Sequence, residues 1–319
     1  MKKLFTVMLI IFMLVGCGTE ETTTKFKIGV IQWAEHPALD DAHTGLVDGL
    51  ESLGLTEEVE LIHKLANGEA SNANMIISQF VDEGVDLIYA IATPAAQTAV
   101  SGTQDLEIPI VFNAVTDAVV AGLVVSNEAP GGRVTGVSDM APIDKQLALI
   151  KEFIPSVSTV GVLYNTGEDN SVHQINLIED LIGNHGMSLH VQGISGPQEI
   201  ALATEDLVSK SDAIYIITDN TVADAAPQVV GIANEQNIPV FMAEAGQFDQ
   251  GILASDSISY HGLGEQAANM VKQILIDGIS PGEIPVEITD KTELLVSQSV
   301  ADRLGIDIPD SILERASVR

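Results

Sequence analysis

Cysteine is almost absent from this chain, since Cys17 is the only one among 319 residues. A framework of internal disulfides is therefore excluded, and stability must come from an ordinary apolar core. Basic residues are also scarce: 14 lysines and arginines stand against 45 acidic residues, for a formal net charge of −31. Such a chain repels nucleic acid and does not adhere to anionic lipid headgroups, so we expect no nucleic-acid partner.

Apolar stretches long enough to span a bilayer are missing as well. Two lysines precede a short apolar run, Leu4–Val15, which ends at Gly16-Cys17. This pattern resembles a bacterial lipoprotein signal (residues 1–17), in which a peptidase cuts before the cysteine and Cys17 receives a lipid. An ordinary secretory signal with a chance cysteine is the alternative. We expect an extracytoplasmic protein held at the cell membrane by its lipid anchor alone, with residues 18–25 as a flexible tether.

The chain also lacks the common sequence motifs of catalysis and of metal binding. The chain holds no G-x-S-x-G elbow, no P-loop, no H-E-x-x-H helix and no G-x-G-x-x-G turn. None of the seven histidines pairs with another at a metal-ligand spacing, and Asp40-Asp41 and Asp169 lack the alternation of a calcium loop. We therefore expect no enzyme, no cofactor and no metal. An enzyme acting on a small metabolite stays open as a competing interpretation.

What the chain does contain is an alternation of apolar, strand-like runs with segments of helical periodicity. Near-continuous apolar strands with helical crossovers indicate α/β architecture with parallel sheets covered on both faces. We expect strands at Lys27–Trp33, Val59–Leu65, Leu87–Ile91, Pro109–Asn113, Arg133–Val137, Thr159–Tyr164, Leu189–Ile194, Ala213–Ile217, Pro239–Met242 and Gly251–Ser255. The helices between them include Ala38–Leu53, Ala73–Glu83, Ala95–Thr103, Asp144–Phe153, Val172–Gly183 and Ala223–Glu235.

The two halves of the chain are similar to each other. Three motifs of the first half return in order in the second: Ile-Gly-Val as Val-Gly-Val, Asp-Leu-Ile-Tyr as Asp-Ala-Ile-Tyr, and Ile-Pro-Ile-Val-Phe as Ile-Pro-Val-Phe. All three offsets fall near about 130 residues, which predicts two similar lobes rather than one long sheet with coincidental echoes.

The last part of the chain crosses back between these lobes. It contains an amphipathic helix, Tyr260–Ile276, then a strand at Glu293–Val296 and a helix at Ser299–Leu304. Several crossovers between two lobes make a hinge. We expect lobe 1 to hold residues 26–140 plus about 258–282, and lobe 2 to hold residues 141–257 plus about 283–319.

Polar residues follow the predicted strands of both halves. In open parallel sheets, ligands bind beyond the carboxyl ends of the strands, so a cleft between the lobes is the expected site. The candidate ligand-binding residues at these ends are Gln32, Trp33, His36, Thr93, Ala95, Thr116, Asp117, Ser138, Asn165, Asn170, Ser171, Asp219, Asn220 and Glu244. The same strand ends carry Asp139, Thr218 and Thr221. Taken singly, these residues fit helix caps and solvated carboxylates equally well; their number on two facing edges favours a site.

The residue types at these ends indicate the ligand's chemistry. Helix N-termini such as that at Thr93-Pro94 offer free N–H groups that suit a carboxylate. Of only four arginines, Arg133 alone lies near a predicted strand edge, which disfavours a phosphate or dicarboxylate ligand. Acidic side chains combined with helix N-termini fit a ligand that carries both an ammonium and a carboxylate group, which is an amino acid.

Seven segments together resemble the ABC-transporter substrate-binding lipoproteins of the TrpX type, over about residues 26–310. They are IGVIQWAEHPALD, IATPAAQTA, IPIVFNAVTDAV, PGGRVTGVSD, VGVLYNTGEDNS, AIYIITDNTVADA and ILASDSISYHGLGEQAA. The resemblance implies a periplasmic-binding-protein type I fold, with two Rossmann-like lobes joined by three crossovers. It also implies a monomer that closes like a hinge on an amino acid, an aromatic one such as tryptophan or a phenylalanine-like one, and delivers it to an ABC permease and its ATPase.

The resemblance also implies roles within the cleft. Thr93, its neighbouring amides and Ser171 would hold the ligand's carboxylate. Asp219, helped by Asp117 or Glu244, would hold its ammonium, and Trp33 would pack against its side chain. A ligand-sensing lipoprotein that does not transport, and a binder of a sugar or a nucleoside, remain alternative interpretations.

Overall fold

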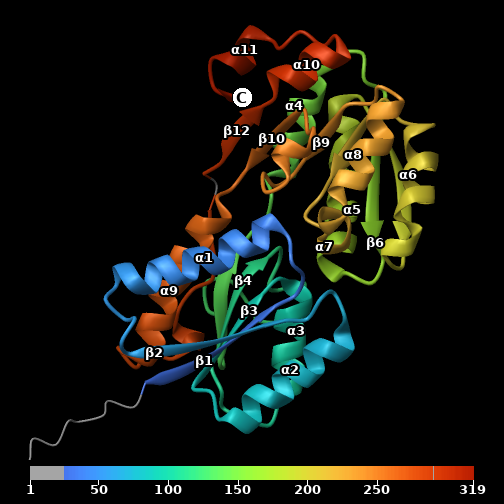
Figure 1. The fold of residues 1–319 in the computed structure, drawn as a ribbon. Helices are drawn as coiled ribbons and strands as arrows, with labels where there is room; N and C mark the ends of the chain where they lie inside the picture. The colour runs from blue at the N-terminus through green and yellow to red at the C-terminus, as the bar shows by residue number, and fades with distance from the viewer. Residues whose placement is uncertain (1–24, 290) are drawn as a thin grey trace, which may run out of the picture.

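The computed structural model describes residues 25–289 and 291–319. The expected signal peptide, the lipidation of Cys17 and most of the tether therefore lie outside the described residues. The described chain forms two α/β lobes, one below and one above in Figure 1, joined by three crossing segments. Its helices all fall short of the length and apolarity that a membrane crossing requires.

Lobe 1 is built on a six-stranded sheet in the order β11-β5-β4-β3-β1-β2, in which every pair is parallel. Strands β3, β4 and β5 are buried along their whole length, which explains their continuous apolar sequences. The strands are β1 (Phe26–Gln32), β2 (Val59–Leu65), β3 (Leu87–Ile91), β4 (Ile110–Val115), β5 (Val134–Ser138) and β11 (Glu287–Ile288). The helices are α1 (Pro37–Ser52), α2 (Ala70–Glu83), α3 (Thr93–Gly102) and α9 (Tyr260–Leu275).

Helix α9 joins lobe 1 from the far end of the chain. It lies along α1 on one face of the sheet, while α2 and α3 cover the other (Figure 1). Glycines allow the two helices to approach closely: a Cβ at Gly264 would lie 2.6 Å from the Leu46 nitrogen, and one at Gly49 would lie 2.6 Å from the Ala268 Cβ. The predicted amphipathic helix is thus confirmed, and its apolar face is buried in lobe 1.

Lobe 2 is built on a seven-stranded sheet in the order β13-β12-β10-β9-β8-β6-β7, with β10 and β12 antiparallel. The strands are β6 (Thr159–Asn165), β7 (Ser188–Ile194), β8 (Ala213–Ile216), β9 (Val240–Met242), β10 (Ala254–Ser257), β12 (Glu293–Val296) and β13 (Ser317–Val318). The helices are α4 (Ile143–Phe153), α5 (Asp169–Leu181), α6 (Ile200–Val208), α7 (Asn220–Asp224), α8 (Ala226–Glu235), α10 (Gln298–Leu304) and α11 (Asp310–Leu313). The parallel strands of both lobes direct their carboxyl ends toward the space between the lobes.

Two predicted elements differ from the structure in an informative way. The single helix expected at Ala223–Glu235 is divided into α7 and α8, because Pro227 has no backbone N–H to continue the helical hydrogen bonds past Ala225. The strand expected at Gly251–Ser255 begins only at Ala254. Gly251 adopts a φ of 107° after a 3₁₀ turn, and this left-handed conformation delays the strand.

The third crossing lies later than the sequence predicts. Strand β11 pairs with β5 in lobe 1, whereas β12 pairs with β10 in lobe 2. The chain therefore returns to lobe 2 between residues 288 and 293 rather than at about 283. Strand β11 has only two residues, too few to be recognised as a strand from the sequence. Its place in lobe 1 is therefore known only from its pairing with β5 in the folded sheet.

Candidate functional site

A small cavity of about 20 Å³ lies between the carboxyl ends of the two sheets. Lobe 1 and its crossing segment contribute His36, Leu39, Thr93, Ala114, Thr116, Asp139 and Tyr260. Lobe 2 contributes Asn170, Thr218, Asp219, Asn220, Ala223 and Glu244. Polar groups from both lobes thus surround one small, largely filled cavity.

On the lobe 1 side, the backbone is strained where β3 and β4 end. Ala92 has a φ of 83° and Ala114 a φ of 55°, both in a region that residues with a Cβ rarely adopt. This conformation turns the chain sharply from β3 into α3, so that Thr93 begins the helix on the cavity wall. The Thr93 hydroxyl is buried with no hydrogen-bond partner in the described chain. The first amides of α3 have no helical partner either, because the helical ladder begins at Ala96.

On the lobe 2 side, a buried network holds the first turns of α5 and α7 together. The Glu168 carboxylate accepts hydrogen bonds from the backbone and side chains of Asn220 and Thr221, at 2.6–3.1 Å. Asn170 donates its amide to the carbonyl of Thr218 at 2.9 Å, which leaves its side-chain oxygen buried and without a partner among the described residues. These bonds place Asn170 and Asn220 rigidly on the cavity wall.

Asp219 has a structural role as well as a place in the cavity. Its two carboxylate oxygens accept from the Val222 nitrogen at 2.8 Å, as the N-cap of α7, and from the Asn165 nitrogen at 2.6 Å. Each carboxylate oxygen has two lone pairs, so Asp219 retains the capacity to accept a further hydrogen bond.

The corner of the cavity nearest the hinge combines Asp139, Tyr260 and Glu244. The Tyr260 hydroxyl donates to Asp139 Oδ2 at 2.7 Å, and the Thr116 hydroxyl lies 3.2 Å from Asp139 Oδ1. Glu244 follows β9 and accepts the backbone N–H of Gly246 with Oε2. Its other oxygen, Oε1, is buried and has no partner in the described part of the chain.

His36 lies on the cavity wall and is 5 % exposed. It is the N-cap of α1, yet its side chain does not cap the helix, and neither ring nitrogen has a hydrogen-bond partner within the described residues. The Asn220 side chain approaches the imidazole and opposes the lowering of its pKa by burial. The two side chains do not reach hydrogen-bond geometry.

Positive charge is missing from the cavity wall, since no lysine or arginine of the described chain lines it, whereas three carboxylates do. Burial raises the pKa of Glu244 to about 7. Burial and the neighbouring Glu168 raise the pKa of Asp219, and burial raises that of Asp139. His36 adds no charge near neutral pH, because burial lowers its pKa to about 4. A bound cationic group would be stabilised by these carboxylates.

Comparison with known proteins agrees with this geometry. The family model described as ABC transporter substrate binding protein matches residues 27–318, which is nearly the whole described chain. This chain belongs to that family. The tyrosine-binding protein of Clostridioides difficile strain R20291 is 38% identical to it over 308 residues, which are 92% of this chain and 88% of the relative. The family consists of binding components of transporters, in agreement with the expectation that the protein is not an enzyme.

Two solved structures indicate how the lobes of this substrate-binding protein are arranged. A Streptococcus pneumonia ABC domain in complex with L-Trp is 35% identical and matches with a TM-score of 0.89. The ligand-free, open structure of a Clostridium difficile substrate-binding protein is 38% identical but matches with a TM-score of only 0.69. Both comparisons cover 92% of this chain and 99% of the other. The lobes of this substrate-binding protein therefore resemble the ligand-bound arrangement more than the open one.

Contacts between the lobes agree with a closed arrangement. Gln97 of α3 donates to Asp169 of α5 at 2.8 Å, and His173 lies 3.6 Å from Asp117. At the hinge side, Gly246 lies against the first turn of α1.

Seven of the fourteen predicted ligand residues line the cavity of this substrate-binding protein. They are His36, Thr93, Thr116, Asn170, Asp219, Asn220 and Glu244. All seven lie beyond the carboxyl end of a strand, as the rule for parallel sheets requires.

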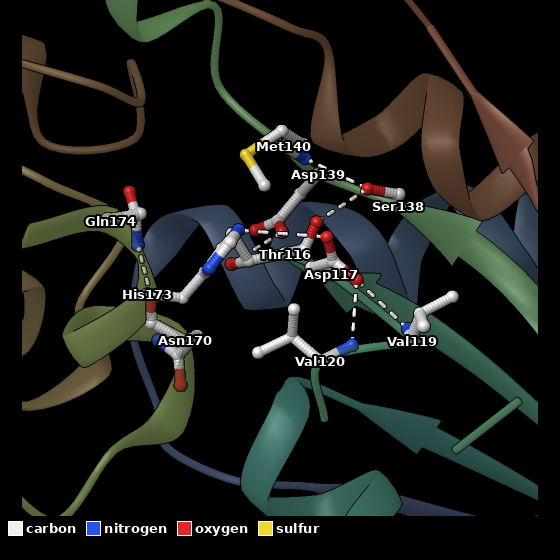
Figure 2. A network of polar contacts seen from close by, with 10 residues as sticks. All are labelled: Thr116, Asp117, Val119, Val120, Ser138, Asp139, Met140, Asn170, His173 and Gln174. Atoms are coloured by element: carbon white, nitrogen blue, oxygen red, sulfur yellow. Dashed lines mark hydrogen bonds and ion pairs between the residues drawn. The ribbon is translucent and has the colours of Figure 1, made fainter. Parts of the chain in front are cut away.

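The other seven predicted residues do not line this cavity. Gln32 is turned toward Asp40 and His63, and Asn165 donates to Thr221. Ala95 and Ser171 are buried in the first turns of α3 and α5. Ser138 connects the Thr116 carbonyl to the Met140 nitrogen, as Figure 2 shows.

Trp33 and Asp117 are placed differently from the sequence-based expectation. Trp33 lines a second, larger cavity between the lobes, together with Pro197 and Thr221, so in this arrangement it does not border the central cavity. The Asp117 carboxylate accepts the backbone N–H groups of Val119 and Val120, both at 2.9 Å, and faces His173 (Figure 2). Asp117 is thus engaged at the edge of the cleft rather than in its centre.

Six lining residues were not among the predicted ligand residues: Leu39, Ala114, Asp139, Thr218, Ala223 and Tyr260. Asp139 and Thr218 carry a recognisable signal, because both are polar residues at strand ends. Tyr260 has no such signal. It reads as the first residue of an amphipathic helix, and it reaches the cavity only because α9 packs beside α1.

Proposed function

We propose that this protein is the lipid-anchored, extracytoplasmic binding component of an ABC importer for an aromatic amino acid. The observation that carries this proposal is the charge arrangement of the cavity. Three buried carboxylates, from Asp139, Asp219 and Glu244, share a small cavity with Thr93, at the start of α3, where the first amides have no helical partner. An ammonium group and a carboxylate group on one small molecule complement such a wall.

The carboxylate of the ligand is assigned to the side of the cavity where α3 and α5 begin. There the Thr93 hydroxyl and the first amides of α3 are available as donors. Asn170, in the first turn of α5, borders this end, which the positive end of each helix dipole also favours.

The ammonium of the ligand is assigned to Asp219. Asn170 donates to the carbonyl of Thr218, the residue before Asp219, so this carboxylate is adjacent to the proposed carboxylate subsite. The two charged groups of an amino acid share one carbon atom and require such adjacent subsites. Asp117 is less suited, because its carboxylate is engaged outside the central cavity.

The ligand's side chain is assigned to the remaining, largely apolar wall. Leu39, Ala114 and Ala223 contribute small or aliphatic groups, and Tyr260 contributes an aromatic ring. The relatives support an aromatic side chain, since one is named a tyrosine-binding protein and another was solved with L-Trp.

Isothermal titration calorimetry with matched ligands tests the proposal. We expect L-tyrosine and L-tryptophan to bind, and tyramine and 4-hydroxyphenylpropionate to bind at least about 100-fold more weakly, because each lacks one of the two charged groups. The fluorescence of Trp33 provides a second readout of lobe closure when the ligand itself is not fluorescent. Trp33 suits this measurement because it is the only tryptophan and lies between the lobes. Equal binding of tyramine and tyrosine, or binding of a nucleoside or sugar instead, would end the proposal.

The lipid anchor and the monomeric state require separate measurements. Mass spectrometry of the membrane-extracted protein should find a lipid on Cys17 and no residues before it, and Cys17→Ser should release the protein from the membrane. Size-exclusion chromatography with light scattering should give a monomer with and without ligand.

A further inference from the structure

Glu244 differs from the other two carboxylates of the cavity. Both oxygens of Asp139 are hydrogen-bonded, by Thr116 and Tyr260, and both oxygens of Asp219 accept backbone N–H groups. Glu244 uses Oε2 to accept the Gly246 nitrogen, while Oε1 has no partner in the described chain. Glu244 is also 2 % exposed, so its side chain is shielded from bulk solvent.

The strand order places Glu244 away from the subsite proposed for the ligand's carboxylate. In the sheet of lobe 2, β6, β8 and β9 are neighbours, and polar residues of the cavity follow each of them. Asn170 follows β6, Asp219 follows β8 and Glu244 follows β9. Neighbouring strands are about 4.8 Å apart, so Glu244 lies roughly two spacings, or about 10 Å, along the edge from Asn170.

This spacing matches the shape of an aromatic amino acid. With its carboxylate at the start of α3 and α5 and its ammonium at Asp219, the ligand would extend its ring along the edge of the sheet toward β9. The ring would lie against Leu39 and Tyr260, and the outermost ring atoms would reach Glu244.

We propose that Glu244 accepts a hydrogen bond from a donor at the far end of the ligand's side chain and so selects amino acids whose ring carries such a donor. A phenol O–H or an indole N–H satisfies Oε1, whereas an unsubstituted phenyl ring leaves it buried without a partner. Sites that are built to bind a substrate hydroxyl reject the analogue without it for this reason. The proposal rests on the amino-acid function proposed above.

Paired titrations with L-tyrosine and L-phenylalanine test this role, because the two ligands differ only by the hydroxyl. The wild-type protein should bind tyrosine at least about 10-fold more tightly, as expected for a hydrogen bond to a charged group. Glu244→Gln, which keeps the size of the side chain, and Glu244→Ala should weaken tyrosine binding and leave phenylalanine binding unchanged or stronger. The tyrosine/phenylalanine ratio should therefore approach one in Glu244→Ala.

Asp219→Asn is the matched comparison, because removal of an ammonium contact must weaken both ligands by the same factor. An equal loss for both ligands in the Glu244 variants would assign Glu244 to the ammonium and overturn the proposal, as would a wild-type ratio near one. O-methyl-tyrosine, titrated into the wild-type protein, gives a test independent of variant folding and should bind at least about 10-fold more weakly than tyrosine. If no amino acid binds at all, the function proposed above fails, which is a distinguishable result.

Discussion

His173 Nε2 of lobe 2 lies 3.6 Å from Asp117 Oδ2 of lobe 1, across the edge of the ligand cleft (Figure 2). The Asp117 carboxylate is held in place by two backbone N–H groups, from Val119 and Val120. Because the two side chains belong to different lobes, their contact depends on the closed arrangement. The pair therefore stabilises closure without touching the central cavity.

His173→Gln should weaken ligand binding by up to about fivefold, because partly exposed ion pairs contribute about 0.2–1 kcal/mol. Isothermal titration calorimetry with the best amino-acid ligand measures the effect. His185→Gln is the matched control, since His185 pairs with Asp144 at 2.8 Å within lobe 2 and should not change the affinity. The same loss in both variants would show that the effect is not one of lobe closure.

Asp219→Asn should lower the affinity for every amino-acid ligand by at least about 30-fold, because loss of one partner of a buried charge pair costs about 2–5 kcal/mol. Asparagine remains a good N-cap, so α7 should persist and the melting temperature should change little. Asp212→Asn is the control: Asp212 also accepts two backbone N–H groups, from Ser158 and Thr159, but at the opposite end of β6. Unchanged affinity in Asp219→Asn would refute its role.

Ligand affinity should fall as the pH is lowered from about 8 to about 6. Burial raises the pKa of Glu244 to about 7 and also raises that of Asp219, so in the ligand-free cavity these carboxyls take up protons as the pH falls through this range. The ligand's ammonium favours the ionised form of Asp219, and the ring donor proposed for Glu244 favours the ionised form of that carboxyl. At lower pH binding must therefore displace protons and becomes weaker. Calorimetry in two buffers with different ionisation enthalpies should detect proton release, and pH-independent binding would contradict this assignment.

Gly246→Ala should weaken binding by hindering closure. An added Cβ would lie 2.7 Å from the Ala38 nitrogen and 3.1 Å from the Pro37 Cβ, both in lobe 1, and 2.8 Å from Glu244 Oε2. Because the contact with α1 is lost when the lobes separate, the melting temperature of the ligand-free protein should change little while affinity falls. Gly231→Ala is the control, since no heavy atom of the described chain lies within 4 Å of its added Cβ. Small-angle scattering would detect a ligand-saturated variant that stays open.

The strands and the repeat were predictable because both depend on local sequence. Near-continuous apolar runs such as Leu87–Ile91 can be stable only when both faces of a strand are covered, and this strand lies where it was predicted. Residues that follow such strands, including Thr93, Asp219 and Glu244, were correctly predicted to lie beyond the carboxyl ends of strands in the two sheets. The rule that ligands bind beyond the carboxyl ends of parallel strands needs only the direction of each strand, and it needs no knowledge of contacts between distant segments.

The rest of the site depended on contacts that sequence patterns do not encode. Tyr260 meets Asp139 across 121 residues of chain because α9 packs on α1 through glycines. Trp33 immediately follows a strand that reaches the cavity edge, yet in the closed arrangement it borders a neighbouring cavity instead.

The amino-acid sequence by itself determined the two-lobed α/β architecture, the absence of internal disulfides and the polar residues at the carboxyl ends of the strands. These follow from periodicity and composition, which act over a few residues at a time. Only the tertiary structure decided which of those residues share one cavity, and that Glu244 alone among its three carboxylates has an oxygen without a partner in the described chain. Burial and hydrogen-bond partners depend on how distant segments pack, because each lobe supplies half of the wall.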